Sequence, residues 1–236
     1  MQVFVIIPAA GLGTRMAPQG TAVHAPKQFM ELSGKPVLIV TMRAFLQVQA
    51  IEQVFVAVRK NEIERVQGQL QEHGLTARVS VVEGGDTRQD SVRNALHRLP
   101  AGDDDIVLIH DAVRPLIDAA TIERTIESVE RHQAAIVAVP AVDTIKQVER
   151  TADGAIITST IPRQHIVLAQ TPQGFRCGLL RRAFQGAEAD GFAGTDEASL
   201  VERLGIEVAV VQGSAKNFKI TQPGDLALAE FYLRQR

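Results

Sequence analysis

The sequence predicts an α/β fold: a Rossmann-like, mostly parallel twisted sheet with helices on both faces and a projecting β-arm. Short apolar runs typical of buried strands alternate with helical patterns over the first 140 residues. Aromatic residues make up only 4% of the chain and apolar residues 45%, so the core must be mostly aliphatic, as in helix-covered parallel sheets. The 236 residues suit a single domain over residues 1–236, with a β-arm insertion at about 141–170.

The elements of the sheet follow one another in a regular order. The expected strands are 3–7, 54–58, 79–82, 106–109 and 136–139. The helices between them are expected at 36–48, 61–73, 87–98 and 119–132, with Pro36 in a first helical turn and Asp118 as an N-cap. After the arm, helices are expected at 176–187, 196–204 and 224–234, and a strand at 207–211. Ligands of this architecture bind outside the carboxyl ends of the strands.

The regular alternation stops after residue 139. Two strands, at 144–149 and 155–160, are joined through Thr151–Gly154, which is a hairpin signal. An exposed ribbon with apolar faces commonly binds a partner, so this arm could form a dimer. Packing of the hairpin on its own domain is an equal alternative from the pattern alone.

Composition excludes several classes of protein. A net charge of −2 argues against nonspecific nucleic-acid binding, which needs a basic surface. The single cysteine, Cys177, excludes an internal disulfide and a multi-cysteine zinc site, and we expect it to pack in a helix. No apolar run reaches the ~20 residues of a membrane helix, and the N-terminus lacks the basic region of a signal peptide. We therefore expect a cytoplasmic protein without a membrane partner.

A small-residue loop, Pro8–Met16, follows the first strand. Such a loop lets backbone N–H groups approach a polyphosphate, and Arg15 and Lys27 add cations. It is not a dinucleotide fingerprint, because Met16 stands where the third glycine belongs, and no Gly-Lys is followed by Ser or Thr as a Walker loop requires. The remaining prediction is a nucleotidyltransferase loop, with an ordinary glycine-rich turn as the alternative.

A second cluster, Glu83–Ser91, ends a strand and opens a helix. Asp86 is expected as the N-cap, with Gln89 three residues later as in a weak capping box. Arg88 and Ser91 lie on or near the first helical turn. We expect this cluster to contact a nucleotide, with capping alone as the alternative for Asp86.

A third cluster follows the strand at 106–109. A carboxylate such as Asp111 is costly to bury there unless it is paired or binds something. It could hold a ribose hydroxyl or position Mg²⁺ with the phosphates. Arg114 could bind a phosphate or simply pair with Asp111, whereas His110 is expected to be a packed strand-end residue.

Polar residues on and after the arm form a fourth cluster: Thr144, Arg163 and Thr171, with Thr195-Asp196-Glu197 opening a helix, where the helix dipole favours the two carboxylates. Hydroxyls and an arginine suit a polyol phosphate, although a helix N-cap also explains Thr195. Lys219, just before the last helix, is either a further cation of the site or a solvated strand-edge charge.

The chain shows no Ser/His/Asp set, no zinc spacing and no nucleophile supported by a motif. A phosphate monoester that attacks the α-phosphorus of a nucleoside triphosphate is already anionic near neutral pH, so it needs no general base. Such an enzyme has only to position two polyanions and stabilise the added charge. An NAD-dependent oxidoreductase and a noncatalytic nucleotide-binding regulator are the alternatives from other classes.

Taken together, the clusters resemble the 2-C-methyl-D-erythritol 4-phosphate cytidylyltransferases of the non-mevalonate isoprenoid pathway. The resemblance covers nearly the whole chain in order. The matching segments are Pro8–Met16, Pro26–Gln28, Gly84–Ser91, His110–Pro115, Asp143–Thr144, Gln170–Gln173, Thr195–Ala198 and Asn217–Leu226. The segment between Arg15 and Lys27 is longer than is usual in this family, which leaves the reach of Lys27 open.

The resemblance implies an enzyme that transfers a cytidylyl group from CTP to methylerythritol phosphate, with Mg²⁺ bound mainly through the CTP phosphates and Asp111 as a candidate ligand. It implies catalytic roles for Arg15, Lys27 and Lys219. The implied nucleotide-binding residues are Ala9, Ala10, Gly11, Gly13, Gly85, Asp86, Ser91 and Asp111. The implied residues of the polyol-phosphate site are Arg114, Thr144, Arg163, Thr171 and Thr195.

The resemblance also implies a homodimer in which the arm is exchanged and Arg163 reaches the partner's site. Ribitol 5-phosphate cytidylyltransferases share most of these motifs and are the alternative in the same class. Because the motifs fill the chain, we expect no second fused enzyme.

Overall fold

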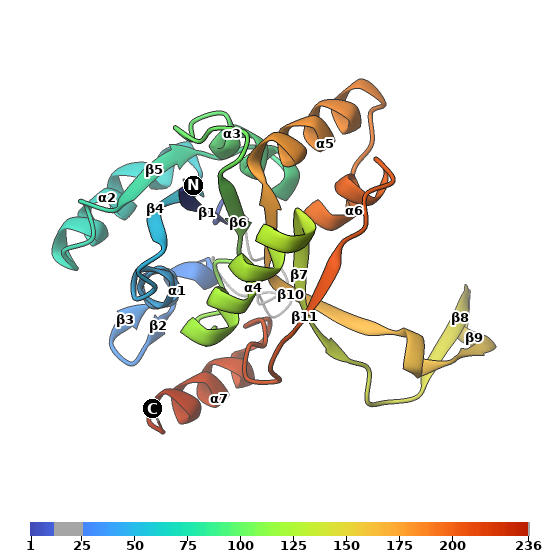
Figure 1. The fold of residues 1–236 in the computed structure, drawn as a ribbon. Coiled ribbons are helices and arrows are strands. Elements are labelled where there is room, and N and C mark those ends of the chain that lie inside the picture. The colour runs from blue at the N-terminus through green and yellow to red at the C-terminus, as the bar shows by residue number, and fades with distance from the viewer. Residues whose placement is uncertain (12–25, 236) are drawn as a thin grey trace.

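The computed structural model describes residues 1–11 and 26–235, and this part of the chain forms an α/β fold around a seven-stranded twisted sheet (Figure 1). The strand order is β11-β7-β10-β6-β1-β4-β5. The strands are β1 (Val3–Pro8), β4 (Ile51–Val58), β5 (Val79–Glu83), β6 (Ile106–Ile109), β7 (Ala134–Pro140), β10 (Val167–Arg176) and β11 (Ala209–Gln212). β1 pairs in parallel with β4 and β6, β4 with β5, and β7 with β11, so the sheet is mostly parallel as expected.

Helices cover both faces of the sheet. They are α1 (Val37–Leu46), α2 (Ile63–Glu72), α3 (Arg88–Leu96), α4 (Ala119–His132), α5 (Cys177–Ala189), α6 (Glu197–Glu202) and α7 (Pro223–Leu233). Side chains alternate across β1: Val5 packs with α1, α2 and α4, whereas Phe4 and Ile6 pack with α3, α5 and α6. Two aliphatic cores result, and Cys177 is buried in the second, as expected for a helix-packing residue.

The helix ends confirm one predicted cap and correct another. The Asp118 side chain accepts a hydrogen bond from the backbone N–H of Thr121, so it caps α4 as expected. Asp86 does not cap α3. Thr87 does, in a capping box in which its Oγ1 accepts from the N–H of Asp90 and Asp90 Oδ2 accepts from the N–H of Thr87. A reciprocal pair satisfies two free N–H groups at once, which Asp86 followed by Gln89 does not.

Strand β10 was not predicted, and it runs antiparallel between β6 and β7 in the middle of the sheet. Its sequence contains Gln170, Thr171 and Gln173, which are all buried. Buried polar residues interrupt the apolar alternation on which strand prediction depends. They are tolerated because each has a hydrogen-bond partner from a distant part of the chain.

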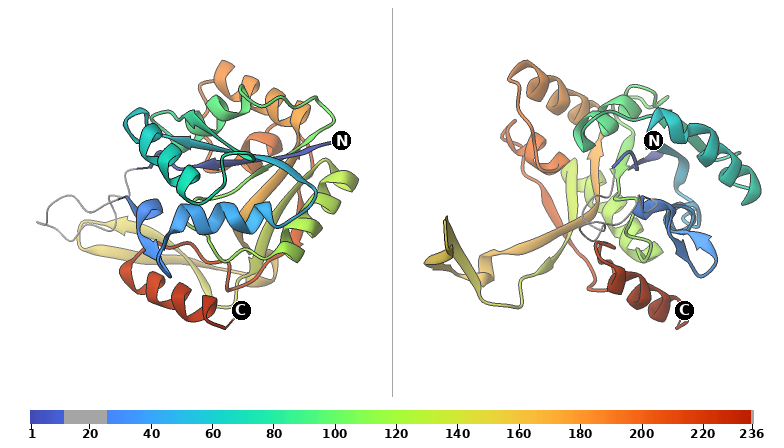
Figure 2. Two further views of the ribbon diagram at one scale, coloured as in Figure 1. Left: turned by 90° about the vertical axis from the view of Figure 1, so that its left-hand side faces the viewer. Right: turned by 180° about the vertical axis from the view of Figure 1, so that it is seen from behind.

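The predicted arm is a two-stranded antiparallel hairpin, β8 (Ile145–Thr151) and β9 (Gly154–Ile161), which projects from the body of the molecule (Figures 1 and 2). Its turn is at residues 152–153, as the hairpin signal indicated. Val142, Ile156 and Ile157 are 75%, 62% and 60% exposed. A short two-stranded sheet, β2 (Glu31–Leu32) and β3 (Lys35–Pro36), lies against α1 and α7. Among the described residues, no helix is long and apolar enough to cross a membrane.

Candidate active site

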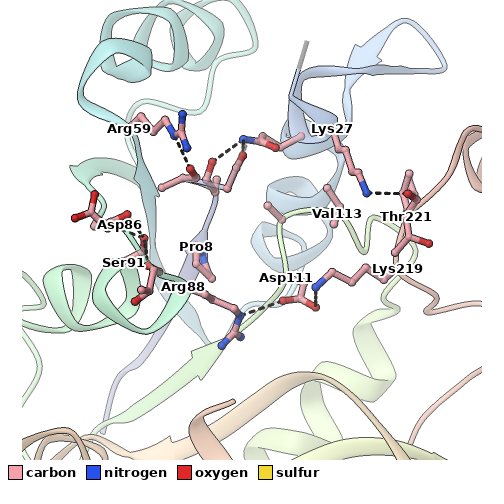
Figure 3. A pocket seen from close by; sticks show the side chains of 18 residues that line it. Pro8, Lys27, Arg59, Asp86, Arg88, Ser91, Asp111, Val113, Lys219 and Thr221 are labelled. Atoms are coloured by element: carbon pink, nitrogen blue, oxygen red, sulfur yellow. Dashed lines mark hydrogen bonds and ion pairs between the residues drawn. The ribbon is translucent and has the colours of Figure 1, made fainter. Parts of the chain in front are cut away.

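A pocket of about 360 Å³ opens at the carboxyl ends of β1, β4, β5 and β6, where Pro8, Arg59, Gly85 and Asp111 line it (Figure 3). This is the edge at which open α/β sheets bind ligands. Residues proposed from the sequence make up much of its wall: Ala9, Ala10, Gly11, Lys27, Gly85, Asp86, Ser91, Asp111 and Lys219.

The other sequence candidates lie elsewhere. Arg114 and Thr171 do not line the pocket, but both contact Asp111. Thr144, Arg163 and Thr195 are exposed and are not among its lining residues. The predicted roles of Gly13, Arg15 and the long segment up to residue 25 fall outside the described residues.

Two residues that sequence reasoning missed hold the loop after β1. Gln28 Nε2 donates to the carbonyls of Ala9 at 2.7 Å and Gly11 at 3.2 Å. Arg59 Nε donates to the carbonyl of Ala10 at 2.7 Å. Each of these three carbonyls therefore has a donor, which holds residues 9–11 in place. Arg59 could have been found, because it is the residue directly after a predicted strand.

The loop after β5 needs its glycines for close packing. A Cβ on Gly84 would lie 2.8 Å from Ala10 Cβ, and one on Gly85 would lie 2.3 Å from Asp90 Cβ. The buried Ser91 hydroxyl accepts from the N–H of Gly85 at 3.1 Å and lies 2.9 Å from the carbonyl of Thr87, to which it can donate. Ser91 thus braces this loop as well as lining the pocket.

Three cationic side chains surround the carboxylate of Asp111 in the pocket. Its Oδ2 lies 3.1 Å from Lys219 Nζ and 3.1 Å from Arg114 Nε, and its Oδ1 lies 3.4 Å from Arg88 Nε. Burial alone would raise its pKa, but Lys219, Arg88 and Arg114 outweigh burial and hold the pKa well below the ordinary value. Asp111 therefore stays ionised, and Lys219 is paired with it rather than free at a strand edge. The surplus of cations suits an anionic ligand.

The backbone of Asp111 is also fixed. Its N–H donates to Thr171 Oγ1 at 3.0 Å. The Thr171 hydroxyl lies 3.0 Å from His110 Nδ1, and His110 Nε2 lies 3.0 Å from the carbonyl of Arg114. Since a carbonyl only accepts, Nε2 carries the proton and Nδ1 accepts from the hydroxyl. His110 is fully buried, a packed strand-end residue as expected, and this network joins β6 to β10.

We predict a pH-dependent stability that originates at His110. Burial lowers its pKa from 6.5 to about 4, so the unfolded chain binds more protons between these values. The contribution of neutral His110 to the free energy of unfolding is complete above pH 6.5 and is lost as the pH falls towards 4. It amounts to about 3 kcal/mol. Urea unfolding at pH 7 and pH 4.5 should show that His110→Gln loses about 2–3 kcal/mol less than wild type over this interval.

The exposed His132 supplies the control for this measurement. His132→Gln should lose as much stability as wild type between the two pH values. Equal losses in all three proteins would show that His110 does not titrate differently in the folded and unfolded chains.

Lys27 also lines the pocket, beside Thr221 (Figure 3). It is 8% exposed, and its Nζ donates to the carbonyl of Thr221 at 2.7 Å. The N–H and Oγ1 of Thr221 in turn donate to Asp225 Oδ2 at 2.7 and 2.9 Å, at the start of α7. The cation is thus held by a segment almost two hundred residues further along the chain.

The donor set near the pocket suits a metal that is bound mostly by a ligand. Within residues 1–11 and 26–235, no group of three or more His, Cys, Asp and Glu side chains could hold a metal ion. Asp111 supplies one ionised carboxylate, whose Oδ2 already faces two cations. A hard divalent cation could take one such carboxylate together with phosphate oxygens and water.

Comparison with known proteins finds relatives over the whole chain. A model of the 2-C-methyl-D-erythritol 4-phosphate cytidylyltransferase family matches residues 3–235. The enzyme of that name from Acidobacterium capsulatum is 68% identical over 236 residues, covering 100% of this chain and 99% of its own. Its counterpart from Solibacter usitatus is 49% identical over 238 residues, covering 100% and 97%.

Solved structures agree with these sequence relatives. The crystal structure of the Francisella tularensis 2-C-methyl-D-erythritol 4-phosphate cytidylyltransferase superposes with a TM-score of 0.81 at 36% identity, covering 98% of this chain and 99% of its own. The enzyme from Thermus thermophilus gives a TM-score of 0.79 at 35% identity, covering 99% and 100%.

Proposed function

Because the chain belongs to the 2-C-methyl-D-erythritol 4-phosphate cytidylyltransferase family, it transfers a cytidylyl group from CTP to 2-C-methyl-D-erythritol 4-phosphate, and we propose that the pocket around Asp111 is the site of transfer. The products are 4-diphosphocytidyl-2-C-methyl-D-erythritol and pyrophosphate. The observation that carries the assignment of the site is a buried, ionised Asp111 among Lys219, Arg114 and Arg88, with Lys27 lining the same pocket.

In this proposal the residues act by charge and position. A phosphate oxygen of the polyol phosphate forms a bond to the α-phosphorus of CTP, and the bond from that phosphorus to the oxygen bridging to the β-phosphate breaks. Pyrophosphate leaves with the electron pair. The nucleophile is anionic, so no side chain has to remove a proton. Lys27 and Lys219, with Arg15 by resemblance, stabilise the added negative charge.

We assign the cytidine end of CTP to the wall made by the loops after β1 and β5. Ala9 and Ala10 line the pocket together with Gly85 and Asp86, and the carbonyls of residues 9–11 already have hydrogen-bond donors. The nucleotide-binding set keeps Gly13 by resemblance. Ser91 supports this wall through its bonds to the backbone.

We assign Mg²⁺ as the metal of the reaction. Cytidylyltransferases generally use a divalent metal, and the pocket offers the ionised carboxylate of Asp111. When bound through the CTP phosphates, the metal would neutralise charge on the triphosphate. Asp111 would orient it, while the cations around the carboxylate set where the phosphates lie.

We propose that the polyol-phosphate site is completed by a second copy of this chain. Thr144 and Arg163 lie exposed on and beside the arm, away from the pocket of their own chain. The arm carries exposed Val148, Ile156 and Ile157, a surface that a partner would cover. Thr171, Arg114 and Thr195 would complete the site from the body of the molecule.

We further propose a cytoplasmic location and no nucleic-acid partner. A net charge of −2 argues against nonspecific binding to nucleic acid, and both substrates are small soluble phosphates.

Pyrophosphate release with CTP and Mg²⁺ tests the substrate. Release should be fast with 2-C-methyl-D-erythritol 4-phosphate and at background level with ribitol 5-phosphate, since only the former fits the family. A chelator should stop the reaction, and added Mg²⁺ should restore it. Preference for ribitol 5-phosphate would keep the pocket and its chemistry but contradict the substrate.

A further inference from the structure

Glu197, the first residue of α6, is a buried carboxylate just behind the pocket. It is 1% exposed, and the sequence placed it in the fourth cluster, where a favourable interaction with the helix dipole was expected for it. Arg88 Nη1 lies 2.8 Å from Glu197 Oε1 and 2.9 Å from Oε2. The Nε of the same guanidinium lies 3.4 Å from Asp111 Oδ1. Arg88 therefore connects a buried anion to the carboxylate at the centre of the pocket.

Glu197 is held in place from the opposite side. Its N–H and that of Ala198 both donate to Gln173 Oε1 at 3.1 Å. Gln173 Nε2 donates to Asp196 Oδ2 at 2.8 Å. The first turn of α6 is thus tied to β10 in the middle of the sheet, so the backbone that carries the Glu197 side chain is fixed.

The charges explain why the pair needs both members. Burial raises the pKa of Glu197, and the guanidinium of Arg88 opposes that rise. The carboxylates of Glu197 and Asp111 raise the pKa of Arg88, against the lowering effect of burial. A buried ion pair is often no more stabilising than apolar side chains of the same volume. What such a pair does provide is a fixed direction for the planar guanidinium.

The two oxygens of Asp111 differ in how they are held. Oδ2 has both Lys219 and Arg114, whereas Oδ1 has Arg88 as its ion-pair partner. Arg88 is itself 31% exposed and lines the pocket. Without Glu197, the phosphates of a bound nucleotide would compete for its guanidinium, and Oδ1 would lose that partner.

We propose that Glu197 is a positioning residue for cytidylyl transfer: it orients Arg88 and through it holds Asp111 Oδ1 in the geometry that the reaction needs. The inference rests on the proposed role of the pocket. It also explains why Arg88, a cation at the pocket wall, faces two carboxylates.

Glu197→Gln is the first variant to measure, because it removes the charge and keeps the shape. A displacement of reacting groups by about 1 Å can cost about 10²-fold in rate, so we expect kcat to fall about 10- to 100-fold. KM for CTP should stay within about threefold, because the nucleotide keeps its other contacts. Glu202→Gln, an exposed position on the same helix, is the matched control and should behave as wild type.

A double variant separates positioning from simple stabilisation. Arg88→Met combined with Glu197→Gln leaves no unpaired charge in the interior, so its Tm should exceed that of Glu197→Gln alone. Its activity should equal that of Arg88→Met within about twofold, because Glu197 acts through Arg88. If the double variant recovered both the activity and the Tm of wild type, the role of Glu197 would be only structural and the proposal would be overturned.

Two further outcomes complete the test. Wild-type kcat in Glu197→Gln, or losses that multiply in the double variant, would overturn the inference. If Glu197→Gln does not fold, the comparison of Arg88→Met with the double variant still distinguishes a positioning role of Glu197 from a structural one.

Asp111→Asn is measured alongside. Full activity of Asp111→Asn would contradict the role of the pocket itself, whereas an inactive Asp111→Asn with a fully active Glu197→Gln would contradict only the role of Glu197.

Discussion

Replacing Lys27 with alanine is expected to lower kcat about 10²- to 10³-fold, which is the effect of removing one preorganised donor from a transition state. The Lys27 side chain is buried at the pocket and its Nζ is held 2.7 Å from the carbonyl of Thr221, so its charge is in place before the reaction begins. Charge increases at the α-phosphorus only during transfer, so KM for CTP should change by no more than a few-fold.

Steady-state kinetics with both substrates, together with a thermal melt, test this prediction. Lys60→Ala removes an exposed lysine next to Arg59 and should leave kcat and Tm unchanged. A Lys27→Ala enzyme with normal kcat and much weaker CTP binding would make Lys27 a ground-state ligand. A fall in Tm that accounts for the lost activity would make the Lys27–Thr221 contact structural.

Two inactive variants are expected to regain activity when they are mixed. Arg163→Glu damages the arm and leaves the pocket intact, whereas Lys27→Ala damages the pocket and leaves the arm intact. If the arm of one chain completes the pocket of its partner, each mixed dimer has one site made of two intact parts. An equal mixture of freely exchanging subunits should then recover about a quarter of wild-type sites.

The mixture is assayed for pyrophosphate release after native mass spectrometry has shown that mixed dimers are present. Arg182→Glu, an exposed position on α5, controls for the charge reversal and should be active alone. Mixed dimers with no gain in activity would show that Arg163 does not act across subunits. A protein that remains monomeric at assay concentration, and is active, would contradict the dimer itself.

Much of the fold could be predicted from local sequence. The aliphatic runs of β1, β4 and β6 are largely buried on both faces, so their hydrophobicity alone marks them as central parallel strands. The turn residues at the tip of the arm predicted its hairpin. Once the strands were in order, the rule that ligands bind at their carboxyl ends placed Asp111 and the loops at Ala9 and Gly85 at one edge.

Strand β10 could not be predicted from its local sequence pattern. Gln170, Thr171 and Gln173 are as polar as loop residues, yet they are buried in the middle of the sheet. Their burial is favourable only because Ser214, His110 and the start of α6 supply hydrogen-bond partners. A short window of sequence contains no information about partners that far along the chain. The local pattern of a polar strand therefore predicts a loop.

The candidate site divides in the same way. Residue type and spacing were enough to propose a phosphate-binding chemistry and to nominate Lys27, Asp111 and Lys219. The partners of the charged residues around the pocket were decided by the tertiary structure, because they are far apart in the chain. Arg88 and its ion-pair partner Glu197 are separated by 109 residues, and Lys27 and the Thr221 carbonyl that it contacts by 194. Local sequence determines which segments become strands and helices through backbone preference and apolar periodicity, whereas the ion pairs that set the charge of the pocket exist only after those segments have packed together.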